Sequence, residues 1–576
     1  MALIDAQTFQ QRLRKCAVEG VGITQTQPKC QPDDTQRSRS GRGCDRRFKP
    51  LHFSPRLAPV LQQHQTRFYL RKSVQIRLYN TLTRQKEPLQ TLQPGKLGLY
   101  VCGVTVYDLS HVGHARVYIV FDVVQRTARR AGLDVTYVRN FTDVDDKIIA
   151  RANKNGETTD ALTNRMIAAF HEDMNRLDCE SPDIEPRVTT HIPEIVAMIE
   201  EIIRRGHAYV VTGEVQADGT PGNDVYFDVR SFPLYGALSG RSQEDNAEGA
   251  SERVEHDNRK RNQADFALWK SAKPGEPFWQ SPWGNGRPGW HIECSAMACK
   301  HLGETFDVHC GGKDLVFPHH ENEIAQARAA NGQEFARQWM HNGFVTIDSE
   351  KMSKSLGNFF TIRDVLARFH PQVLRYFLLT AHYTHPLNFS DKALEEAQKR
   401  VLYIYEKLAA ADVLLASHGM LVGGQADEPV PALIQKAHEA LTESLFDDFN
   451  TPKALAALSE PIDALAAAVD KPKAAGAIDL IAQVRAFMHE ASGWLGLFQH
   501  PAAATVEAIV EQTRNRLFPP GSETLAEVHR LVEERQLARQ AKAWQRADEV
   551  RAALAALGVE VRDGAQGTTW RPRVGD

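Results

Sequence analysis

The chain lacks the long apolar runs, closely paired cysteines and strong charge excess that define several protein classes. Its longer apolar stretches, such as V-Y-I-V-F-D-V-V at 117–124, fall well short of the roughly 20 residues that span a bilayer. None of its eight cysteines belongs to a C-x-x-C pair, and they form no tight secreted framework. These absences argue against a membrane-spanning protein and a disulfide scaffold, and they favour a reducing cytoplasm.

What is present is a globular composition, with 576 residues and 42% hydrophobic content, which is enough for three or four domains. The net charge of −3 conceals an asymmetry, because residues 1–72 hold 14 Lys or Arg against 5 Asp or Glu. This segment is rich in Arg, Ser, Gln and Pro without sustained periodicity, which predicts disorder. A targeting peptide is one alternative. The acids and prolines favour a floppy extension, or a start placed too far upstream.

The segment from Lys96 to Asn140 predicts a β–α–β unit. L-G-L-Y-V-C-G reads as a strand ending at Gly103, and D-V-T-Y-V-R-N as the strand at 134–140. The residues between them have helical periodicity with arginines in the last turns and Gly132 as a stop. Such a unit implies a parallel sheet, whose ligands bind at the carboxyl ends of the strands.

Two short motifs suit a polyphosphate at that edge. His111-Val112-Gly113-His114 places two histidines at a helix start, where ring N–H groups and the helix dipole stabilise negative charge. Histidines that only cap and pack are the alternative. Lys351-Met352-Ser353-Lys354-Ser355 predicts a cationic loop of the kind that closes over phosphates, although a phosphorylatable surface loop would look similar.

The stretch F-P-H-H-E-N-E at 317–323 predicts a helix starting near Pro318. His319 and Glu323 are then four residues apart on one face, while His320 and Glu321 point elsewhere. One imidazole and one carboxylate can supply two ligands to a metal such as zinc, and a solvated first turn is the alternative. Spacing alone does not choose among Cys294, Cys299 and Cys310 for the remaining ligands.

Together these motifs resemble the cysteinyl-tRNA synthetase family of class I aminoacyl-tRNA synthetases. The resemblance runs from about Val74 to Arg571 and rests on a set of ordered stretches: Y-V-C-G-V-T-V-Y-D-L-S-H-V-G-H, Y-V-R-N-F-T-D-V-D-D-K-I-I, G-R-P-G-W-H-I-E-C-S-A-M, F-P-H-H-E-N-E-I-A-Q, K-M-S-K-S-L-G-N-F and Q-G-T-T-W. The implied reaction activates L-cysteine with ATP and transfers it to the 3′ end of its tRNA.

The resemblance also implies site residues. One zinc ion would be held by Cys102, Cys294, His319 and Glu323. It would select the thiol, because a hydrophobic pocket rejects the near-isostere serine poorly. His111, His114 and Lys354 would bind ATP and catalyse with support from Lys351, and Mg²⁺ would accompany ATP. The substrate pocket would include Thr105, Thr142, Trp290 and Asp314, with core packing as the alternative for Trp290.

The C-terminal part reads as amphipathic Ala/Leu-rich helices followed by a small terminal domain. In E-E-R-Q-L-A-R-Q-A-K-A-W-Q-R the basic residues Arg535, Arg539, Lys542 and Arg546 recur at spacings of 4, 3 and 4, which predicts one basic helical stripe. With Trp570 this stripe suits contact with unpaired anticodon nucleotides. A solvated helix face is the alternative.

The predicted fold is an α/β Rossmann-like parallel-sheet domain split by an insertion, then an α-helical bundle and a small C-terminal domain. The expected organisation is a disordered basic extension at 1–72, the first catalytic half at 73–195, a connective insertion at 196–285, the second catalytic half at 286–345, the K-M-S-K-S loop and stem-contact region at 346–390, the helical bundle at 391–515 and the anticodon-binding domain at 516–576. A monomer is expected, because no interface stripe stands out.

Two other functions fit part of the sequence. An ATP-dependent ligase that joins cysteine to an amino sugar would use a shortened copy of the catalytic half. It would need neither the bundle nor the basic terminal domain. A non-catalytic RNA-binding protein on the same scaffold would not need His111, His114 and Lys354.

Overall fold

The computed structural model describes residues 75–213, 215–216, 219, 222–241, 258–347, 350–351, 360–420, 430–564 and 567–574. The expected disordered extension at 1–72 therefore lies outside the described residues. Two compact units divide the rest: the larger comprises the chain up to Leu525 and the residues from Pro572 onward, and the smaller comprises Ala526–Arg571. Among the described residues, no helix combines the length and apolar character needed to cross a bilayer.

A parallel four-stranded sheet forms the centre of the larger unit, in the order β10-β9-β3-β4. Its strands are β3 (Lys96–Val101), β4 (Asp134–Arg139), β9 (Phe306–Gly312) and β10 (Ala336–Asn342). Helix α2 (Val112–Arg130) connects β3 to β4 as expected, and Gly132 after it has a φ of 90°, which favours glycine. The predicted α/β parallel sheet is confirmed.

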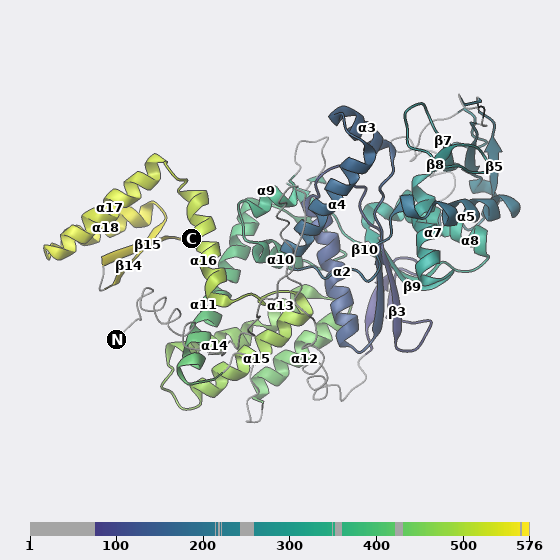
Figure 1. The fold of residues 1–576 in the computed structure, drawn as a ribbon. Coiled ribbons are helices and arrows are strands. Elements are labelled where there is room, and N and C mark those ends of the chain that lie inside the picture. Colours follow the sequence, from purple (N-terminus) through teal and green to yellow (C-terminus); the bar gives the residue numbers. More distant parts are fainter. Residues whose placement is uncertain are drawn as a thin grey trace, which may run out of the picture. The chain divides into compact units, whose positions relative to one another are not determined.

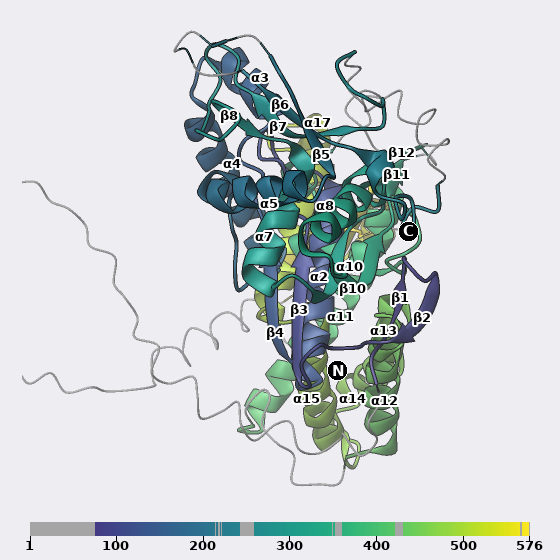
Figure 2. The same cartoon turned by 90° about the vertical axis from the view of Figure 1, so that its right-hand side faces the viewer.

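Helices cover both faces of this sheet. In Figure 1 it lies between α2 on one side and α7 (Trp290–Leu302) and α8 (Glu321–Asn331) on the other. Figure 2 shows the same arrangement with α7 and α8 beside β3 and β4. The two faces have separate cores, with Val101 and Cys310 in the α2 core and Tyr100 and Cys102 in the other. Neighbouring strand residues thus face opposite sides of the sheet, and Cys102 and Cys310 lie on different faces.

The chain between β4 and α7 adds a smaller layer. It contains α3 (Asp146–Asn155), α4 (Thr159–Arg176) and α5 (Ile192–Arg204). An antiparallel sheet follows, composed of β5 (Ala208–Val211), β6 (Asp224–Phe227), β7 (Phe266–Ser271) and β8 (Gly286–Pro288). Before the central sheet, β1 (Arg77–Asn80) and β2 (Gln85–Pro88) form a hairpin.

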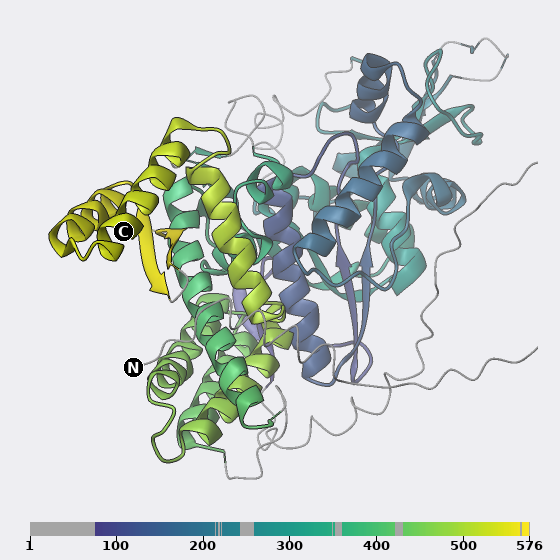
Figure 3. The ribbon, with the colours of Figure 1, turned by 60° about the vertical axis from the view of Figure 1, so that its left-hand side comes forward.

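A small sheet and a helical bundle complete the larger unit. The sheet has the order β12-β11-β13, with β11 (Val345–Ile347), β12 (Glu350–Lys351) and β13 (Leu387–Asn388). After it the helices are α9 (Ile362–Leu366), α10 (Pro371–Leu379), α11 (Asp391–Ser417), α12 (Ala432–Phe446), α13 (Thr451–Ala457), α14 (Ser459–Asp470), α15 (Ala477–Leu495) and α16 (Ala502–Leu517). Figure 3 shows the green helices of this bundle running beside the purple-blue α2.

The smaller unit is built from two helices and a hairpin. Helices α17 (Glu523–Gln540) and α18 (Trp544–Ala556) precede β14 (Val559–Gly564) and β15 (Gly567–Pro572), which pair with each other. Its buried side chains include Val528, Leu531, Val550 and Leu554.

Candidate active site and metal centre

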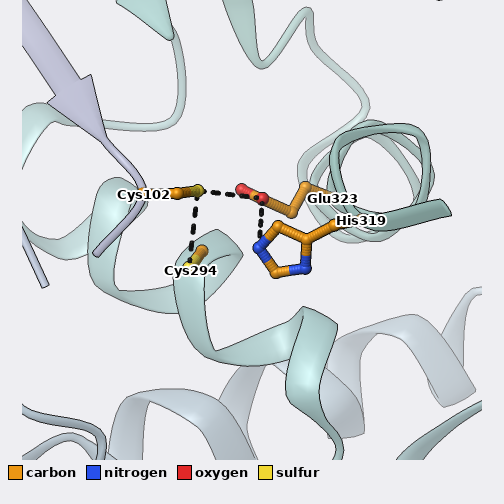
Figure 4. A group of neighbouring side chains, drawn as sticks. All are labelled: Cys102, Cys294, His319 and Glu323. Atoms are coloured by element: carbon orange, nitrogen blue, oxygen red, sulfur yellow. Dashed lines mark hydrogen bonds and ion pairs between the residues drawn. The ribbon is translucent and has the colours of Figure 1, made fainter. Parts of the chain in front are cut away.

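Four side chains from three parts of the chain converge on one buried point. Cys102 directly follows β3, Cys294 lies in α7, His319 lies in the turn before α8, and Glu323 lies in the first turn of α8 (Figure 4). All four are at most 4% exposed, and their ligand atoms lie within 4.8 Å of one another. This buried Cys/His/Glu cluster has the composition of a metal site.

The distances in this cluster fit a tetrahedral ion. Two sulfurs bound at ~2.3 Å to one tetrahedral zinc lie about 3.8 Å apart. Cys102 Sγ and Cys294 Sγ are 3.8 Å apart, and Cys102 Sγ is 3.5 Å from Glu323 Oε1. The sulfur separation is far longer than the ~2.05 Å of a disulfide, so both thiols are available as ligands.

The ring of His319 is held so that Nε2 faces the cluster. Its Nε2 lies 3.0 Å from Glu323 Oε1, as the helical spacing predicts, while Nδ1 is 2.9 Å from Nδ1 of His291. The indole of Trp290, 37% exposed, stacks on the same imidazole with centroids 4.3 Å apart. Trp290 is therefore not an ordinary core residue, and a partner on the second ring nitrogen is typical of a metal-binding histidine.

The buried groups of the cluster shift one another's pKa values. Burial alone would lower the pKa of His319, but Glu323 and Cys294 raise it to about 10. Burial would raise the pKa of Glu323, but His309 and His319 lower it to about 2. A hydrogen bond from Cys102 is the main reason that the pKa of Cys294 falls to about 6, while burial raises that of Cys102 well above its usual value. Of the two thiols, Cys294 therefore has the lower pKa.

The expectation that His320 points away from the cluster is wrong. Its Nε2 lies 3.3 Å from Cys102 Sγ, and its Nδ1 is 2.8 Å from His341 Nε2. His309 Nε2 lies 2.8 Å from Glu323 Oε2, so Cys102, His309, His320 and Glu323 form a second buried tetrad. The reason is the backbone before α8: Phe317 is extended, with φ −139° and ψ 133°, and a π-helical turn precedes the regular helix at Glu321.

His309, His320 and His341 were not predicted as part of the site. A signal for His309 exists in the sequence, because His309 and Cys310 are adjacent in a strand and must face opposite sides. Cys310 belongs to the α2 core and His309 to the cluster face, where it contacts Glu323. Among the described residues, Cys310 belongs to neither tetrad.

The two histidines of H-x-G-H form a reciprocal cap at the start of α2. Each backbone N–H of His111 and His114 donates to Nδ1 of the other, at 3.3 Å, and the rings stack with centroids 3.7 Å apart. Because Nδ1 accepts in both rings, the proton of each neutral imidazole lies on Nε2. Capping and phosphate binding are therefore compatible, since the cap uses only one nitrogen of each ring.

The chain that follows the K-M-S-K-S motif is tied to the start of α2. Lys351, the first residue of the motif, lies in β12 and pairs with Thr346 of β11, and its side chain is outside the described part. After it, Ile362 N donates to Ser110 O at 2.9 Å, and Val112 N donates to Phe360 O at 3.2 Å. Lys354 itself lies outside the described residues. The structure thus brings the backbone just after this motif to the H-x-G-H helix.

The remaining pocket candidates lie at strand ends or on the surface. Thr105 and Thr142 pair just beyond the carboxyl ends of β3 and β4, as their positions predict. Thr142 Oγ1 donates to Glu293 Oε2 at 2.9 Å, and burial raises the pKa of Glu293 well above its usual value. Asp314 is exposed in the turn after β9.

The predicted single basic stripe in the smaller unit is wrong. The helix ends at Gln540, Lys542 has a φ of 58°, and Arg546 lies on the separate helix α18. Arg535 is only 3% exposed, with Nη2 donating to Asp563 Oδ2 at 2.9 Å.

Carboxylates of the same unit also pair with the other two arginines of the predicted stripe. Arg539 Nη1 lies 2.9 Å from Asp563, and Arg546 pairs with Glu534 and Glu549. Trp570 packs against His529 with ring centroids 5.9 Å apart. Because these arginines pair with acidic side chains of the same unit, they do not form a continuous cationic face. A role in tRNA contact stays a prediction for all five residues.

Family models match three regions of the chain. The class I (C) tRNA synthetase catalytic domain matches residues 88–399, the DALR domain residues 440–499, and the cysteinyl-tRNA ligase anticodon binding domain residues 522–571. The last two domains follow the catalytic half. A ligase that joins cysteine to an amino sugar would need neither of them.

Relatives cover most of the chain. It is 50% identical over 512 residues to a cysteine–tRNA ligase of Pelobacter propionicus, covering 86% of this chain and all of that protein. It is 52% identical over 505 residues to one from Anaeromyxobacter sp. (strain K), covering 86% and 99%. Among solved structures, Mycobacterium tuberculosis methionyl-tRNA synthetase in complex with methionyl-adenylate shares the fold, with a TM-score of 0.51 and 17% identity over 73% of this chain and 92% of that one. A catalytic match over more than half of the chain, joined to a matching anticodon domain and full-length relatives, shows that the chain belongs to the cysteine–tRNA ligase family of class I aminoacyl-tRNA synthetases.

Proposed function

We propose that this ligase selects its amino acid with one zinc ion held by Cys102, Cys294, His319 and Glu323. The observation that carries the proposal is the buried set of two thiols, one imidazole and one carboxylate at tetrahedral spacing. When bound, zinc would supply a soft acceptor that distinguishes the sulfur of cysteine from the oxygen of serine. The second tetrad offers one thiol instead of two, so it suits a soft metal less well.

The residues around the cluster hold two of the proposed zinc ligands in place. His291 and Trp290 hold the ring of His319, and His309 holds Glu323, so two ligands are fixed before a substrate arrives. Trp290 is also exposed enough to cover the side chain of a bound amino acid. We assign it to substrate binding with Thr105, Thr142 and Asp314.

The first chemical step needs alignment and charge stabilisation more than a protein nucleophile. The carboxylate oxygen of cysteine attacks the α-phosphorus of ATP, and the bond to the β-phosphate oxygen breaks to release pyrophosphate. His111 and His114 would donate from Nε2 to the phosphates, and Lys354, supported by Lys351, would neutralise the charge that develops on the leaving group. Mg²⁺ would accompany ATP as part of the substrate.

In the second step, a ribose hydroxyl at the 3′ end of the tRNA attacks the cysteinyl carbonyl and AMP leaves. The anticodon-binding domain would contact the tRNA through Arg539, Lys542, Arg546 and Trp570, with Arg535 supporting the unit from within. We propose a monomer that works in the cytoplasm, where tRNA is charged. Light scattering of the full chain tests the oligomeric state.

Cysteine-dependent exchange of labelled pyrophosphate into ATP tests the proposal directly. The zinc-loaded protein should exchange with cysteine and not with serine, and a chelated sample should lose exchange until zinc is restored. Exchange with cysteine that is unchanged after complete metal removal would refute the zinc role and leave the family membership intact.

A further inference from the structure

Arg116 is a fully buried cation on the helix that carries the two phosphate-site histidines. It lies two residues after His114 in α2, and its side chain is 0% exposed. Burial lowers its pKa to about 10, so it stays protonated at neutral pH. Among the described residues, no carboxylate forms an ion pair with it. Burying a charge without a counter-ion costs free energy, and hydrogen bonds must offset that cost.

Four backbone carbonyls from two segments accept the hydrogen bonds of this guanidinium. Nη1 donates to Gly343 O at 3.0 Å and to Phe344 O at 2.7 Å. Nη2 donates to His382 O at 3.2 Å and to His385 O at 2.6 Å. Arg116 therefore joins α2 to two chain segments that are about forty residues apart in sequence.

Both segments lead directly into the small sheet that carries Lys351. Gly343 and Phe344 precede β11, and His385 precedes β13. Strand β11 pairs with β13 on one side and with β12 on the other, where Thr346 lies opposite Lys351. The guanidinium thus fixes the amino ends of two strands, and these strands set the position of the third.

The segment at 382–385 is itself anchored to the helical bundle. Tyr383 Oη donates to Asp448 Oδ1 at 2.7 Å, and His382 Nε2 lies 3.0 Å from Asp448 O. Asp448 and the next residue, Phe449, both have positive φ values, 67° and 49°, which side chains rarely adopt. Residues in this conformation persist only where their surroundings determine them strongly, so the packing here fixes this backbone conformation.

We propose that Arg116 is a positioning residue for adenylate formation, which fixes the strand carrying Lys351 against the helix carrying His111 and His114. An apolar residue of the same size would fill the space without the cost of burying a charge. Only a planar group with several donors can hold two carbonyl pairs in fixed directions. The inference rests on the proposed phosphate role of the two signature motifs.

The test compares the same substitution at two buried arginines in the full-length, zinc-loaded protein. Arg116→Lys keeps the charge and loses the fork, and we expect kcat/KM for ATP in pyrophosphate exchange to fall about 100-fold, the scale of a misplacement near 1 Å. The KM for cysteine and the zinc content should stay unchanged. Arg375→Lys is the control, because Arg375 is 0% exposed and donates to Leu177 O at 2.8 Å and to Leu495 O at 2.9 Å. Unlike Arg116 it also pairs with a carboxylate, that of Asp122 in α2, eight residues after His114.

A second variant reaches the same contact without touching the arginine. A Cβ on Gly343 would lie 2.5 Å from His385 O, so Gly343→Ala must push the two carbonyl pairs apart. We expect the same selective loss for ATP, and this variant decides the matter if Arg116→Lys does not fold.

The outcomes separate the inference from the proposed function. If Arg116→Lys and Gly343→Ala keep ATP parameters within about 3-fold, or lose them only in proportion to a lowered Tm as Arg375→Lys does, Arg116 is structural and the inference fails. If His114→Ala exchanges as fast as the parent protein, the phosphate role of the motif fails instead.

Discussion

The His319–Glu323 pair and the basic residues of the C-terminal helices were both predicted from helical spacing, yet they lie in different surroundings. His319 and Glu323 face each other at 3.0 Å inside a buried cluster, as one helical turn requires. Arg535 and Arg546 lie on two helices and pair with carboxylates of their own unit. Spacing over one turn depends only on a short helix, whereas a stripe over three turns depends on an unbroken one. The spacing of basic residues in the sequence also does not predict which acidic side chains will pair with them.

The largest effect is expected where the buried cluster is broken. Cys294→Ala and His319→Ala should each remove bound zinc and lower cysteine-dependent exchange by at least ~1,000-fold, because each variant leaves only three of the four ligands of the closed site. Zinc content by atomic emission and the exchange assay measure both.

Cys310→Ala is the matched control, since Cys310 is equally buried and belongs to the opposite core. It should cost about 1–2 kcal/mol of stability and keep its zinc. A metal-free Cys310→Ala, or a fully active His319→Ala, would contradict the assignment.

Histidine variants decide between the two overlapping tetrads. If zinc binds with Cys294 and His319, His320→Asn should retain it and lose about 10-fold in affinity, as changes beside a ligand usually do. His309→Asn should do the same through Glu323. Competition with a zinc chelator measures both, and loss of all zinc in His320→Asn would move the ion to the second tetrad.

In the smaller unit, the ion pair of Arg535 contributes to stability. Arg535→Ala should destabilise this unit by about 2 kcal/mol, because it leaves Asp563 without its buried partner. Hydrogen exchange over residues 526–571 of the full chain should rise, while cysteine-dependent exchange should not change. Arg530→Ala removes exposed ion pairs with Glu527 and Glu534 and serves as the near-neutral control.

The exposed cations should act on tRNA and not on activation. Lys542→Ala and Arg546→Ala should weaken tRNA binding only a few-fold, and each lost phosphate contact should reduce the salt slope by about 0.7–0.9. Filter binding at several salt concentrations measures this. An unchanged slope in both variants would mean that the cations of this unit do not face the tRNA.

The smallest effect concerns an ion pair outside both regions. His500 Nε2 lies 2.7 Å from Asp178, whose hydrogen bond raises the pKa of His500. Burial would raise the pKa of Asp178, but His500 lowers it. The contribution of His500 is fully present below pH ~6.5 and is lost as pH rises through its raised pKa, while that of Asp178 is lost as pH falls below ~4.

Because the His500 side chain is 41% exposed, the pair should contribute less than about 1 kcal/mol. The Tm difference between the parent protein and His500→Gln should therefore be larger at pH 5.5 than at pH 8.5. An equal difference at both values would show that the pair does not form.

The sequence predicts the β3–α2–β4 unit well because its signals are local. Apolar periodicity, terminal arginines and Gly132 mark the helix, and the short apolar strands flank it. Contacts between segments that are far apart in the sequence are harder to predict. His341 reaches the cluster from β10, and Arg116 looks like an ordinary helix charge until the carbonyls near Gly343 and His385 surround it. Such partners are set by tertiary packing, which no spacing within one segment encodes.

Cobalt substitution tests the central claim most directly. Co²⁺ replaces zinc in the protein, and its absorption reports how many sulfurs are bound. The account predicts sulfur-to-cobalt absorption from Cys102 and Cys294 that increases when cysteine is added and does not change with serine. A spectrum that responds to neither amino acid, or equally to both, would contradict the claim that this metal site reads the thiol.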